Sequence, residues 1–321
     1  MKIVFFGTPE YVVPVVKALH KTLKSSTENK SSVVAVVTQE PKPVGRKKVL
    51  SHSPVDKWAY GKGIPIFTDS NELFESGLNP DIGVLASFGQ IIPKKILNYF
   101  PHGILNIHPS LLPKYRGASP VRSTIASGEK EAGATIIKLD EKLDHGKIVS
   151  QFKIDLEDKD TSEILREKLF NQSIDVLCSL IKPYLEDKIH LKTQNEKEAT
   201  YTTQITKPEA HIQPKFIKSA LGGKTIKEKM EIPFIKVGAE KKALQVSVTP
   251  ETIDGFIRAM LPWPTAWTTV KTDSKSKPIR LRILKAHISD YVLVLDEVQL
   301  EGRNIVTWKQ LKEGYPTVMF L

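Results

Sequence analysis

The sequence predicts an α/β fold with a mostly parallel sheet, followed by a smaller domain rich in short strands. Near the start, apolar runs at residues 3–6 and 33–37 flank a stretch with helical periodicity. A strand, helix, strand order implies parallel pairing through a right-handed crossover. The C-terminal part instead contains several short strand-like runs, which favour a small barrel. The 321 residues, 40% of them hydrophobic, suffice for two domains with cores of their own.

The turn after the first strand reads Gly7-Thr8-Pro9-Glu10 and leads into the first helix. We expect Thr8 to cap this helix, with Pro9 in its first position. A glycine after the first strand is typical of nucleotide-binding folds. However, the full G-x-G-x-x-G pattern is missing, so a dinucleotide site is not predicted.

Residues 39–53 form a long connection rich in proline, glycine and basic side chains, including Lys42, Arg46, Lys47 and Lys48. A connection of this length without structure of its own is usually functional or disordered. It follows the second strand, so we expect it at the rim of the sheet.

The alternation of helix and strand continues to residue 180. We predict helices at residues 55–60, 71–74, 94–99, 120–127 and 161–180, and strands at residues 64–67, 81–86, 102–108, 134–139 and 148–154. The strand at residues 81–86 ends in Ser87-Phe88-Gly89-Gln90. We expect this tip at the carboxyl edge of the sheet, where such folds place their ligands.

Residues 192–206 are polar and lack periodicity, so we interpret them as a linker between a domain of residues 1–191 and one of residues 207–321. Beyond the linker we predict a helix at residues 253–261 and strands at residues 265–270, 279–286, 292–295 and 304–308. Residues 213–243 are rich in lysine and show no clear pattern.

The candidate chemistry lies at the end of the strand at residues 102–108. Strand side chains alternate, so Asn106 and His108 share a face, and Pro109 ends the strand. An amide beside an imidazole can stabilise a developing oxyanion. Asp144, in a glycine-containing turn, is the candidate carboxylate that orients or charges the imidazole. The three residues suit acyl transfer, although such residues also occur as ordinary turn residues.

The charge of the chain is unevenly distributed, which bears on the kind of partner it binds. Residues 205–321 hold 19 Lys or Arg against 12 Asp or Glu, so they carry +7 of the total +11. This bias indicates a polyanionic partner such as nucleic acid, and a merely solvated basic face remains the alternative.

The single cysteine, Cys178, excludes an internal disulfide, and we expect a buried, inert thiol. Residues 3–6 are too short for a signal peptide, and no run approaches a membrane helix, so we expect a cytoplasmic protein without membrane contact.

Longer motifs surround the three candidate residues. The run Asn106-Ile107-His108-Pro109-Ser110-Leu111-Leu112-Pro113 is followed by the run from Tyr115 to Pro120 and then by Leu143-Asp144-His145-Gly146. In this order the motifs resemble the 10-formyltetrahydrofolate-dependent formyltransferases. Phe6-Gly7-Thr8-Pro9 and Pro262-Trp263-Pro264 extend the resemblance over most of the chain. It is closest to the branch of the family that formylates methionyl initiator tRNA.

The resemblance implies a Rossmann-like formyltransferase domain followed by an OB-like β-barrel. It also implies site residues: Asn106, His108 and Asp144 for catalysis, and Ser110, Leu111, Leu112 and Pro113 for the folate. From their place at a strand tip we add Phe88 and Gly89 to the folate site, and from their charge we assign Lys42, Arg46, Lys47 and Lys48 to tRNA. The implied partners are methionyl initiator tRNA and the co-substrate 10-formyltetrahydrofolate. No metal is implied, and we expect a monomer.

The sequence departs from the family pattern in one place. Between Ile212 and Thr249 the chain carries more residues than the pattern needs, many of them basic. This insert is either a solvated excursion or an added RNA contact.

Other functions remain as alternatives. The glycinamide ribonucleotide branch is disfavoured because a second, basic domain follows the catalytic one. A formyltetrahydrofolate hydrolase unit or an amino-sugar formyltransferase fits the length, but the basic loop at residues 39–53 favours RNA. A non-catalytic RNA-binding protein on the same fold is also conceivable, and the intact Asn106, His108 and Asp144 argue against it.

Overall fold

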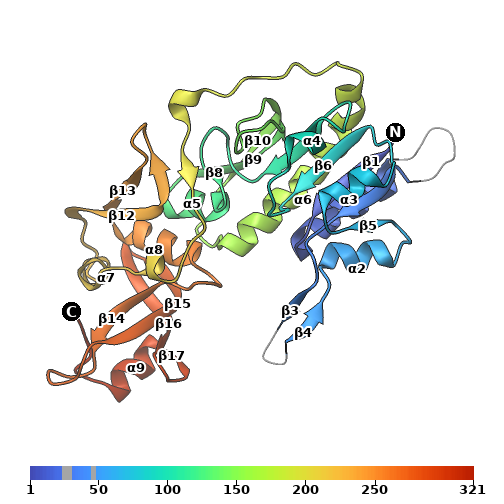
Figure 1. Cartoon of the computed structure of the whole chain (residues 1–321). Helices are drawn as coiled ribbons and strands as arrows, with labels where there is room; N and C mark the ends of the chain where they lie inside the picture. Colours follow the sequence, from blue (N-terminus) through green and yellow to red (C-terminus); the bar gives the residue numbers. More distant parts are fainter. Residues whose placement is uncertain (24–30, 45–47) are drawn as a thin grey trace. The chain divides into compact units, whose positions relative to one another are not determined.

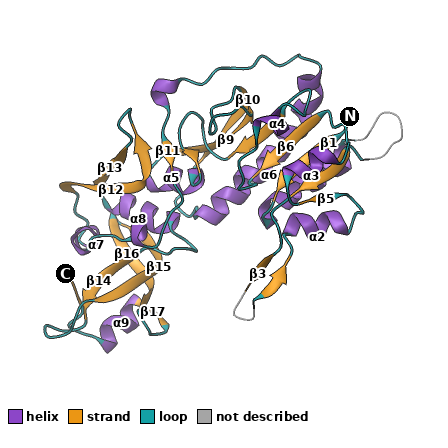
Figure 2. Cartoon of the chain, in the orientation of Figure 1, coloured by secondary structure: helices purple, strands orange, loops and turns teal. Residues whose placement is uncertain are grey.

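A seven-stranded sheet forms the core of the N-terminal part (Figures 1 and 2). The computed structural model describes residues 1–23, 31–44 and 48–321. The sheet order is β10-β9-β7-β6-β1-β2-β5. Its strands are β1 (Ile3–Gly7), β2 (Val33–Val37), β5 (Ile66–Phe67), β6 (Ile82–Ala86), β7 (Ile104–His108), β9 (Glu131–Lys138) and β10 (Ile148–Asp155). The neighbouring strands β7, β6, β1, β2 and β5 all pair in parallel, and β9 is antiparallel to β7. This confirms the predicted mostly parallel sheet.

Helices cover both faces of this sheet because alternate strand residues point to opposite sides. Ile3 and Phe5 of β1 belong to the larger apolar cluster, and Val4 and Phe6 to the other. The larger cluster contains residues of α1 (Val13–Thr22), α2 (Pro54–Tyr60) and α6 (Ser162–Leu185), and the other contains residues of α3 (Ser70–Glu75) and α4 (Lys94–Leu97). All five residues of β1 are therefore buried.

One local expectation in the N-terminal part is wrong. Thr8 caps no helix, because a short 3-10 helix (Glu10–Val12) precedes α1 and Pro9 occupies its N-cap position. The connection at residues 39–53 contains a hairpin, in which β3 (Lys42–Val44) pairs antiparallel with β4 (Val49–Ser51). Ser53 then caps α2 by accepting a hydrogen bond from the backbone N–H of Asp56.

The C-terminal part is rich in antiparallel strands, which confirms the predicted small β domain. One sheet has the order β17-β16-β15-β14-β18 and the other β13-β12-β11-β8. The strands are β8 (Arg116–Gly117), β11 (Tyr201–Thr202), β12 (Ile226–Val237), β13 (Lys242–Val248), β14 (Trp267–Lys271), β15 (Ile279–Ser289), β16 (Val292–Leu300), β17 (Ile305–Thr307) and β18 (Met319–Phe320). The helices of this part are α7 (Pro214–Leu221), α8 (Pro250–Ala259) and α9 (Trp308–Gly314), with 3-10 turns at Glu196–Glu198 and Pro208–Ala210. Strand β8 and helix α5 (Pro120–Ala126) come from earlier in the chain.

The lysine-rich insert has a regular structure. It forms α7 and the long hairpin of β12 and β13, which are antiparallel. Strand β12 pairs with β11, which lies in the predicted linker, and β11 pairs in parallel with β8. The linker therefore contains a strand that its polar sequence conceals. At Gly117, φ is +111°, and a Cβ atom would lie 2.3 Å from the carbonyl oxygen of Thr202, so this pairing requires glycine.

The chain divides into two compact units that interleave along the sequence. The first contains Met1–Pro113, Gly133–Lys153 and Arg166–Glu196. The second contains Lys114–Ala132, Ile154–Leu165 and Lys197–Leu321. The linear boundaries drawn from the sequence stay a prediction.

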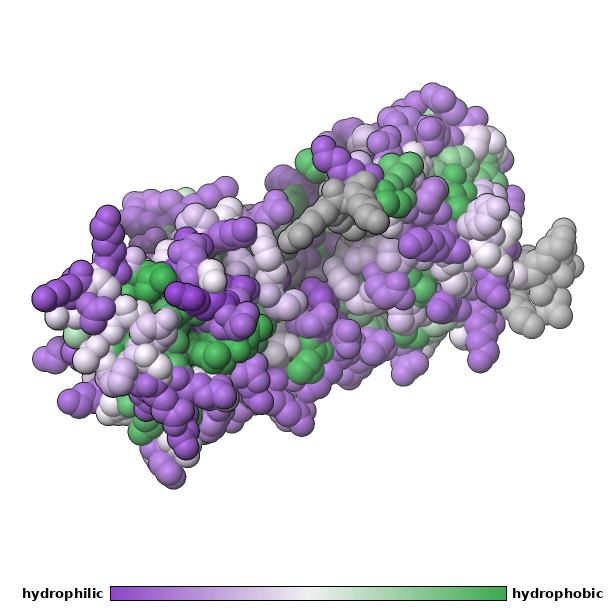
Figure 3. Space-filling view, turned by 90° about the horizontal axis from the view of Figure 1, so that it is seen from below, coloured by the Kyte–Doolittle hydropathy of each residue, from purple (hydrophilic) through white to green (hydrophobic). Residues whose placement is uncertain are grey.

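Three remaining features concern the surface, the helices and the single cysteine. The face seen in Figure 3 is mostly hydrophilic, and its apolar residues form small separate patches. In the described part of the chain, no helix combines the length and apolar character needed to cross a membrane. Cys178 lies on α6 and is only partly buried, and this burial raises the pKa of its thiol. The protonated form, a poor nucleophile, is therefore favoured.

Candidate active site

The end of β7 and the turn between β9 and β10 bring Asn106, His108 and Asp144 together. Asn106 and His108 are 6% and 4% exposed and share one face of β7. The Nδ2 of Asn106 donates to Oδ1 of Asp144 at 3.4 Å. The Nδ1 of His108 lies 3.5 Å from Oδ2 of Asp144. One carboxylate thus contacts both an amide and an imidazole.

This arrangement has a definite chemical capacity. A carboxylate beside an imidazole stabilises positive charge on the ring. The Asn106 amide has two N–H donors, and its contact to Asp144 needs only one of them. A nearly buried amide and imidazole at the carboxyl end of a parallel strand can therefore stabilise negative charge that develops on a bound carbonyl.

The Asp144 turn has an unusual backbone. Asp144 has φ of +47°, which is uncommon for a residue other than glycine. At Gly146 a Cβ atom would lie 1.9 Å from the carbonyl oxygen of Lys138, so only glycine fits there. The side chain of Gln194 donates from Nε2 to the carbonyl oxygens of Asp144 and Gly146, both at 2.8 Å. No sequence pattern pointed to Gln194, because it lies in the polar stretch that we interpreted as a linker.

The segment after His108 is fixed by two side chains that the sequence analysis missed. The hydroxyl of Thr135 donates to the carbonyl oxygen of Ser110 at 2.7 Å and accepts from the N–H of Leu112 at 3.1 Å. Gln151 donates from Nε2 to Thr135 at 2.8 Å and to the carbonyl oxygen of Leu112 at 3.0 Å. Thr135 lies opposite His108 in the β7–β9 pairing. The backbone of residues 110–113 is therefore tied to the strand beside the candidate site.

The two leucines of this segment differ in their surroundings. Leu112 is 3% exposed and packs in an apolar cluster with Ile137 and Ile148. Leu111 is partly buried, and its side chain occupies the space that a Cβ atom at Gly133 would need. Leu112 is thus a core residue, and Leu111 is the leucine with surface left for a ligand.

Three more strand ends are linked at the same edge of the sheet. Gln39, just after β2, donates from its backbone N–H to the hydroxyl of Thr8, just after β1, at 3.3 Å. It also donates from Nε2 to the carbonyl oxygen of Phe88, just after β6, at 3.2 Å. The Phe88 ring is 1% exposed and packs edge-on against Phe6, with ring centroids 5.6 Å apart. Phe88 as a whole is therefore buried, and its carbonyl oxygen is bonded by Gln39, while Gly89, with φ of +79°, continues the turn.

The basic connection is described only in part. Lys42 and Lys48 are exposed, and the Nζ of Lys42 donates to Oε1 of Gln39 at 3.0 Å. Arg46 and Lys47 lie outside the described residues. Among residues 1–23, 31–44 and 48–321, no group of three or more His, Cys, Asp or Glu side chains could hold a metal ion.

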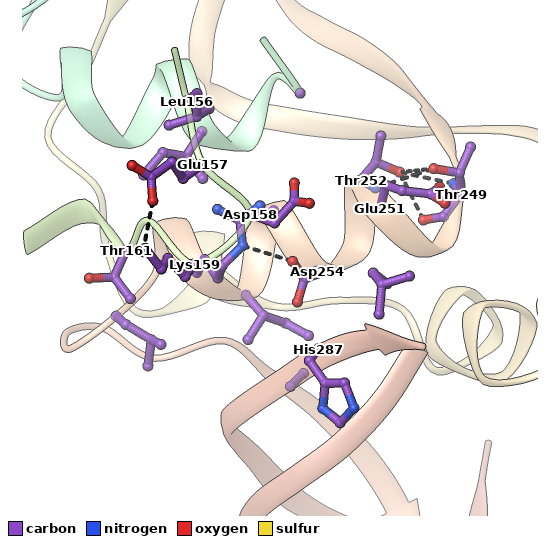
Figure 4. A pocket seen from close by; sticks show the side chains of 18 of the residues that line it. Leu156, Glu157, Asp158, Lys159, Thr161, Thr249, Glu251, Thr252, Asp254 and His287 are labelled. Atoms are coloured by element: carbon purple, nitrogen blue, oxygen red, sulfur yellow. Dashed lines mark hydrogen bonds and ion pairs between the residues drawn. The ribbon is translucent and has the colours of Figure 1, made fainter. Parts of the chain in front are cut away.

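The second unit contains a separate cleft of about 1090 Å³, between α8, β15 and residues 156–161 (Figure 4). None of the predicted site residues that the structure describes lines it. Its most buried carboxyl group, Asp254, is paired with Nε of Arg258 at 2.7 Å, and burial raises the pKa of Asp254. The cleft is thus distinct from the site at the end of β7.

Comparisons with known proteins place these residues in context. A family model described as formyl transferase matches residues 1–181. A methionyl-tRNA formyltransferase of Halalkalibacterium halodurans is 36% identical over 274 residues, which cover 84% of this chain and 74% of the relative.

Two solved structures show the same fold at low identity. A methionyl-tRNA formyltransferase from Clostridium thermocellum has a TM-score of 0.54 and 20% identity, covering 94% of this chain and 98% of its own. An N-formyltransferase from Helicobacter canadensis, in complex with folinic acid and dTDP-3-aminofucose, has a TM-score of 0.60 and 17% identity, covering 90% of this chain and 88% of its own.

Proposed function

Since this chain belongs to the formyl transferase family, we propose that it transfers a formyl group from 10-formyltetrahydrofolate to the amino group of methionyl initiator tRNA. The observation that carries the proposal is the contact of Asp144 with both Asn106 and His108 at the end of β7. The similarity to the Halalkalibacterium halodurans enzyme over 84% of the chain supports methionyl-tRNA as the acceptor. The folinic acid bound by the Helicobacter canadensis relative supports a folate as the donor.

The reaction needs charge stabilisation and one proton transfer. The neutral amine attacks the formyl carbon, a C–N bond forms, and the carbonyl oxygen gains negative charge. The bond from the formyl carbon to N10 of the folate then breaks. The proton lost by the amine is taken up at N10, so tetrahydrofolate and the formylated aminoacyl-tRNA are the products.

The three residues divide this work. Asn106 donates a hydrogen bond to the oxyanion, and protonated His108 supplies a second donor. Asp144 holds the imidazole's charge and orientation or relays the departing proton. Its contact with Asn106 as well as His108 supports the orienting role, because the same carboxylate then fixes both donors.

The direct test mixes the purified protein with 10-formyltetrahydrofolate and methionyl initiator tRNA. We expect the methionyl group to gain a formyl group, measured by mass spectrometry of the released amino acid. A parallel reaction with a nucleotide-linked amino sugar tests the sugar alternative. Formylation of the sugar but not of methionyl-tRNA would refute the proposal.

We further propose that residues 110–113 contact the folate, and Thr135→Val tests how their backbone is held. The substitution removes the acceptor of the buried Leu112 N–H, which costs about 1 to 3 kcal/mol. We expect the KM for 10-formyltetrahydrofolate to rise about tenfold, the equivalent of about 1.4 kcal/mol. The KM for tRNA should not change.

Thr268→Val is the matched control for this substitution. Thr268 is also a fully buried strand threonine, but its hydroxyl has no hydrogen-bond partner among the described residues. It should keep the KM for folate of the unmodified protein. An equal KM in Thr135→Val would show that Thr135 does not hold the folate segment.

The basic connection is our proposed contact for the tRNA acceptor end, with Arg46 as the leading residue. A guanidinium offers a planar fork that lysine does not reproduce, so Arg46→Lys should already be harmful if the contact is bidentate or stacked. Arg46→Ala should weaken tRNA engagement by about 1 to 3 kcal/mol if Arg46 reads a base, or lower the salt slope by about 1 if it meets a phosphate.

Kinetics across a salt series measure both effects, and the KM for folate is the internal reference. Lys21→Ala is the control, because Lys21 is an exposed cation at the end of α1. If Arg46→Ala keeps the salt dependence and efficiency of the unmodified protein, the tRNA is held elsewhere, for example by the basic second domain.

A further inference from the structure

The Gln194 side chain is buried against the turn that carries Asp144. Gln194 is 6% exposed, and its Nε2 donates to the carbonyl oxygens of both Asp144 and Gly146 at 2.8 Å. A side-chain amide nitrogen has two hydrogens, so both are used on the same turn. Gln194 therefore fixes the Asp144–His145 and Gly146–Lys147 peptide groups of this turn.

The turn needs this support. Asp144 holds a backbone conformation with positive φ, which is unfavourable for a residue with a side chain. Residues 140–143 before it are exposed. The close contact of Gly146 with the backbone of Lys138 limits how the turn can relax. A buried amide that bonds both carbonyl oxygens stabilises this one conformation.

A second contact joins the same two segments. The Nε2 of His145 lies 3.5 Å from Oε1 of Glu196, and its Nδ1 lies 2.5 Å from Oδ2 of Asp140. Residues 194–196 thus contact the turn both through Gln194 and through Glu196. The conformation of the Asp144 turn depends on a segment fifty residues further along the chain.

The contacts of Asp144 leave little tolerance for movement. Its oxygens lie 3.4 Å from Nδ2 of Asn106 and 3.5 Å from Nδ1 of His108. Both distances are at the outer limit of hydrogen bonding, where the interaction weakens steeply. A small displacement of the turn would therefore separate the carboxylate from both donors.

We propose that Gln194 is a positioning residue of the formyl-transfer site, which holds the Asp144 carboxylate against Asn106 and His108. This proposal rests on the proposed function. Gln194 bonds the backbone of the turn rather than a substrate, so it acts only through Asp144. Its loss should therefore lower kcat rather than weaken substrate binding.

The test is Gln194→Met, which keeps the side chain's length and removes its N–H donors. We expect kcat to fall about 10- to 100-fold, the size of effect that a displacement of about 1 Å produces at a reacting centre. The KM values for 10-formyltetrahydrofolate and methionyl-tRNA should stay within about twofold, since neither is bound by Asp144.

Gln299→Met is the matched control. Gln299 also donates from Nε2 to the backbone carbonyl of a turn, that of Arg303 at 2.9 Å, but it lies in the second unit on β16. We expect its kcat to equal that of the unmodified protein. A fall of the same size in both variants would mean that Gln194 has only a structural role.

A double-mutant cycle with Asp144→Asn separates positioning from general stability. If Gln194 acts through Asp144, Gln194→Met should lower kcat little further once the carboxylate is gone, so the two effects are not additive. Fully additive effects, or an unchanged kcat in Gln194→Met alone, would overturn the proposal. If Gln194→Met does not fold, Gln194→Glu takes its place, because it keeps the size and replaces the donor nitrogen with an oxygen.

The two proposals fail in different ways. If the unmodified protein does not formylate methionyl-tRNA, the proposed function is wrong. If it does and Gln194→Met is equally active, only the positioning role is wrong.

Discussion

His108→Ala is expected to lower turnover by about two to four orders of magnitude, the usual loss when a general acid or base is removed. His108 is buried beside Asp144 at the end of β7, and its proposed hydrogen bond forms only as the formyl oxygen becomes charged. Binding of the ground-state folate should therefore change little. Steady-state kinetics give the turnover, and calorimetry with a non-reactive folate gives the affinity.

The chain offers a matched control for this substitution. His287 forms a similar pair with Asp296, with Nδ1 and Oδ2 2.9 Å apart, in the second unit. His287→Ala removes a His–Asp pair without touching the candidate site, so we expect full turnover. Near-normal turnover in His108→Ala would show that His108 has no catalytic role.

Asp144→Asn is expected to reduce turnover by at least about two orders of magnitude, with both KM values little changed. The substitution keeps the shape of the side chain and removes its charge. A neutral amide stabilises a protonated imidazole less than a carboxylate does. Its own N–H donors can also face the Nδ2 donor of Asn106, where the carboxylate oxygen accepted. The positive φ at this position is no obstacle, because asparagine adopts it more readily than most residues.

Asp296→Asn is the corresponding control, since it neutralises the partner of His287. It should leave turnover and both KM values unchanged. If Asp144→Asn altered only the affinity for tRNA, Asp144 would be a turn residue that shapes the acceptor site.

The sequence alone determined the parts of this protein that depend on local pattern. The strand, helix, strand order around the apolar runs that became β1 and β2 predicted parallel pairing, because such a connection makes a right-handed crossover. Period-two alternation placed Asn106 and His108 on one face. Asp144 was the candidate carboxylate, and in the structure it lies beside both of these residues. Their catalytic role stays a prediction.

The tertiary structure decided the features that depend on distant partners. Strand β11 reads as a polar linker because its stability comes from pairing with β12 and β8, which its own residues do not encode. The insert likewise gains its order from this sheet. Thr8 was expected to cap a helix, but its hydroxyl accepts from Gln39 across the edge of the parallel sheet.

The supports of the site were equally invisible in the sequence. Thr135, Gln151 and Gln194 hold the backbone around His108 and Asp144 through hydrogen bonds to its peptide groups. Every residue carries these peptide groups, so neither partner of such a bond has a distinctive sequence pattern. The chemical groups of the site could be read from the chain, whereas the side chains that fix their geometry emerged only when segments far apart in sequence were folded together.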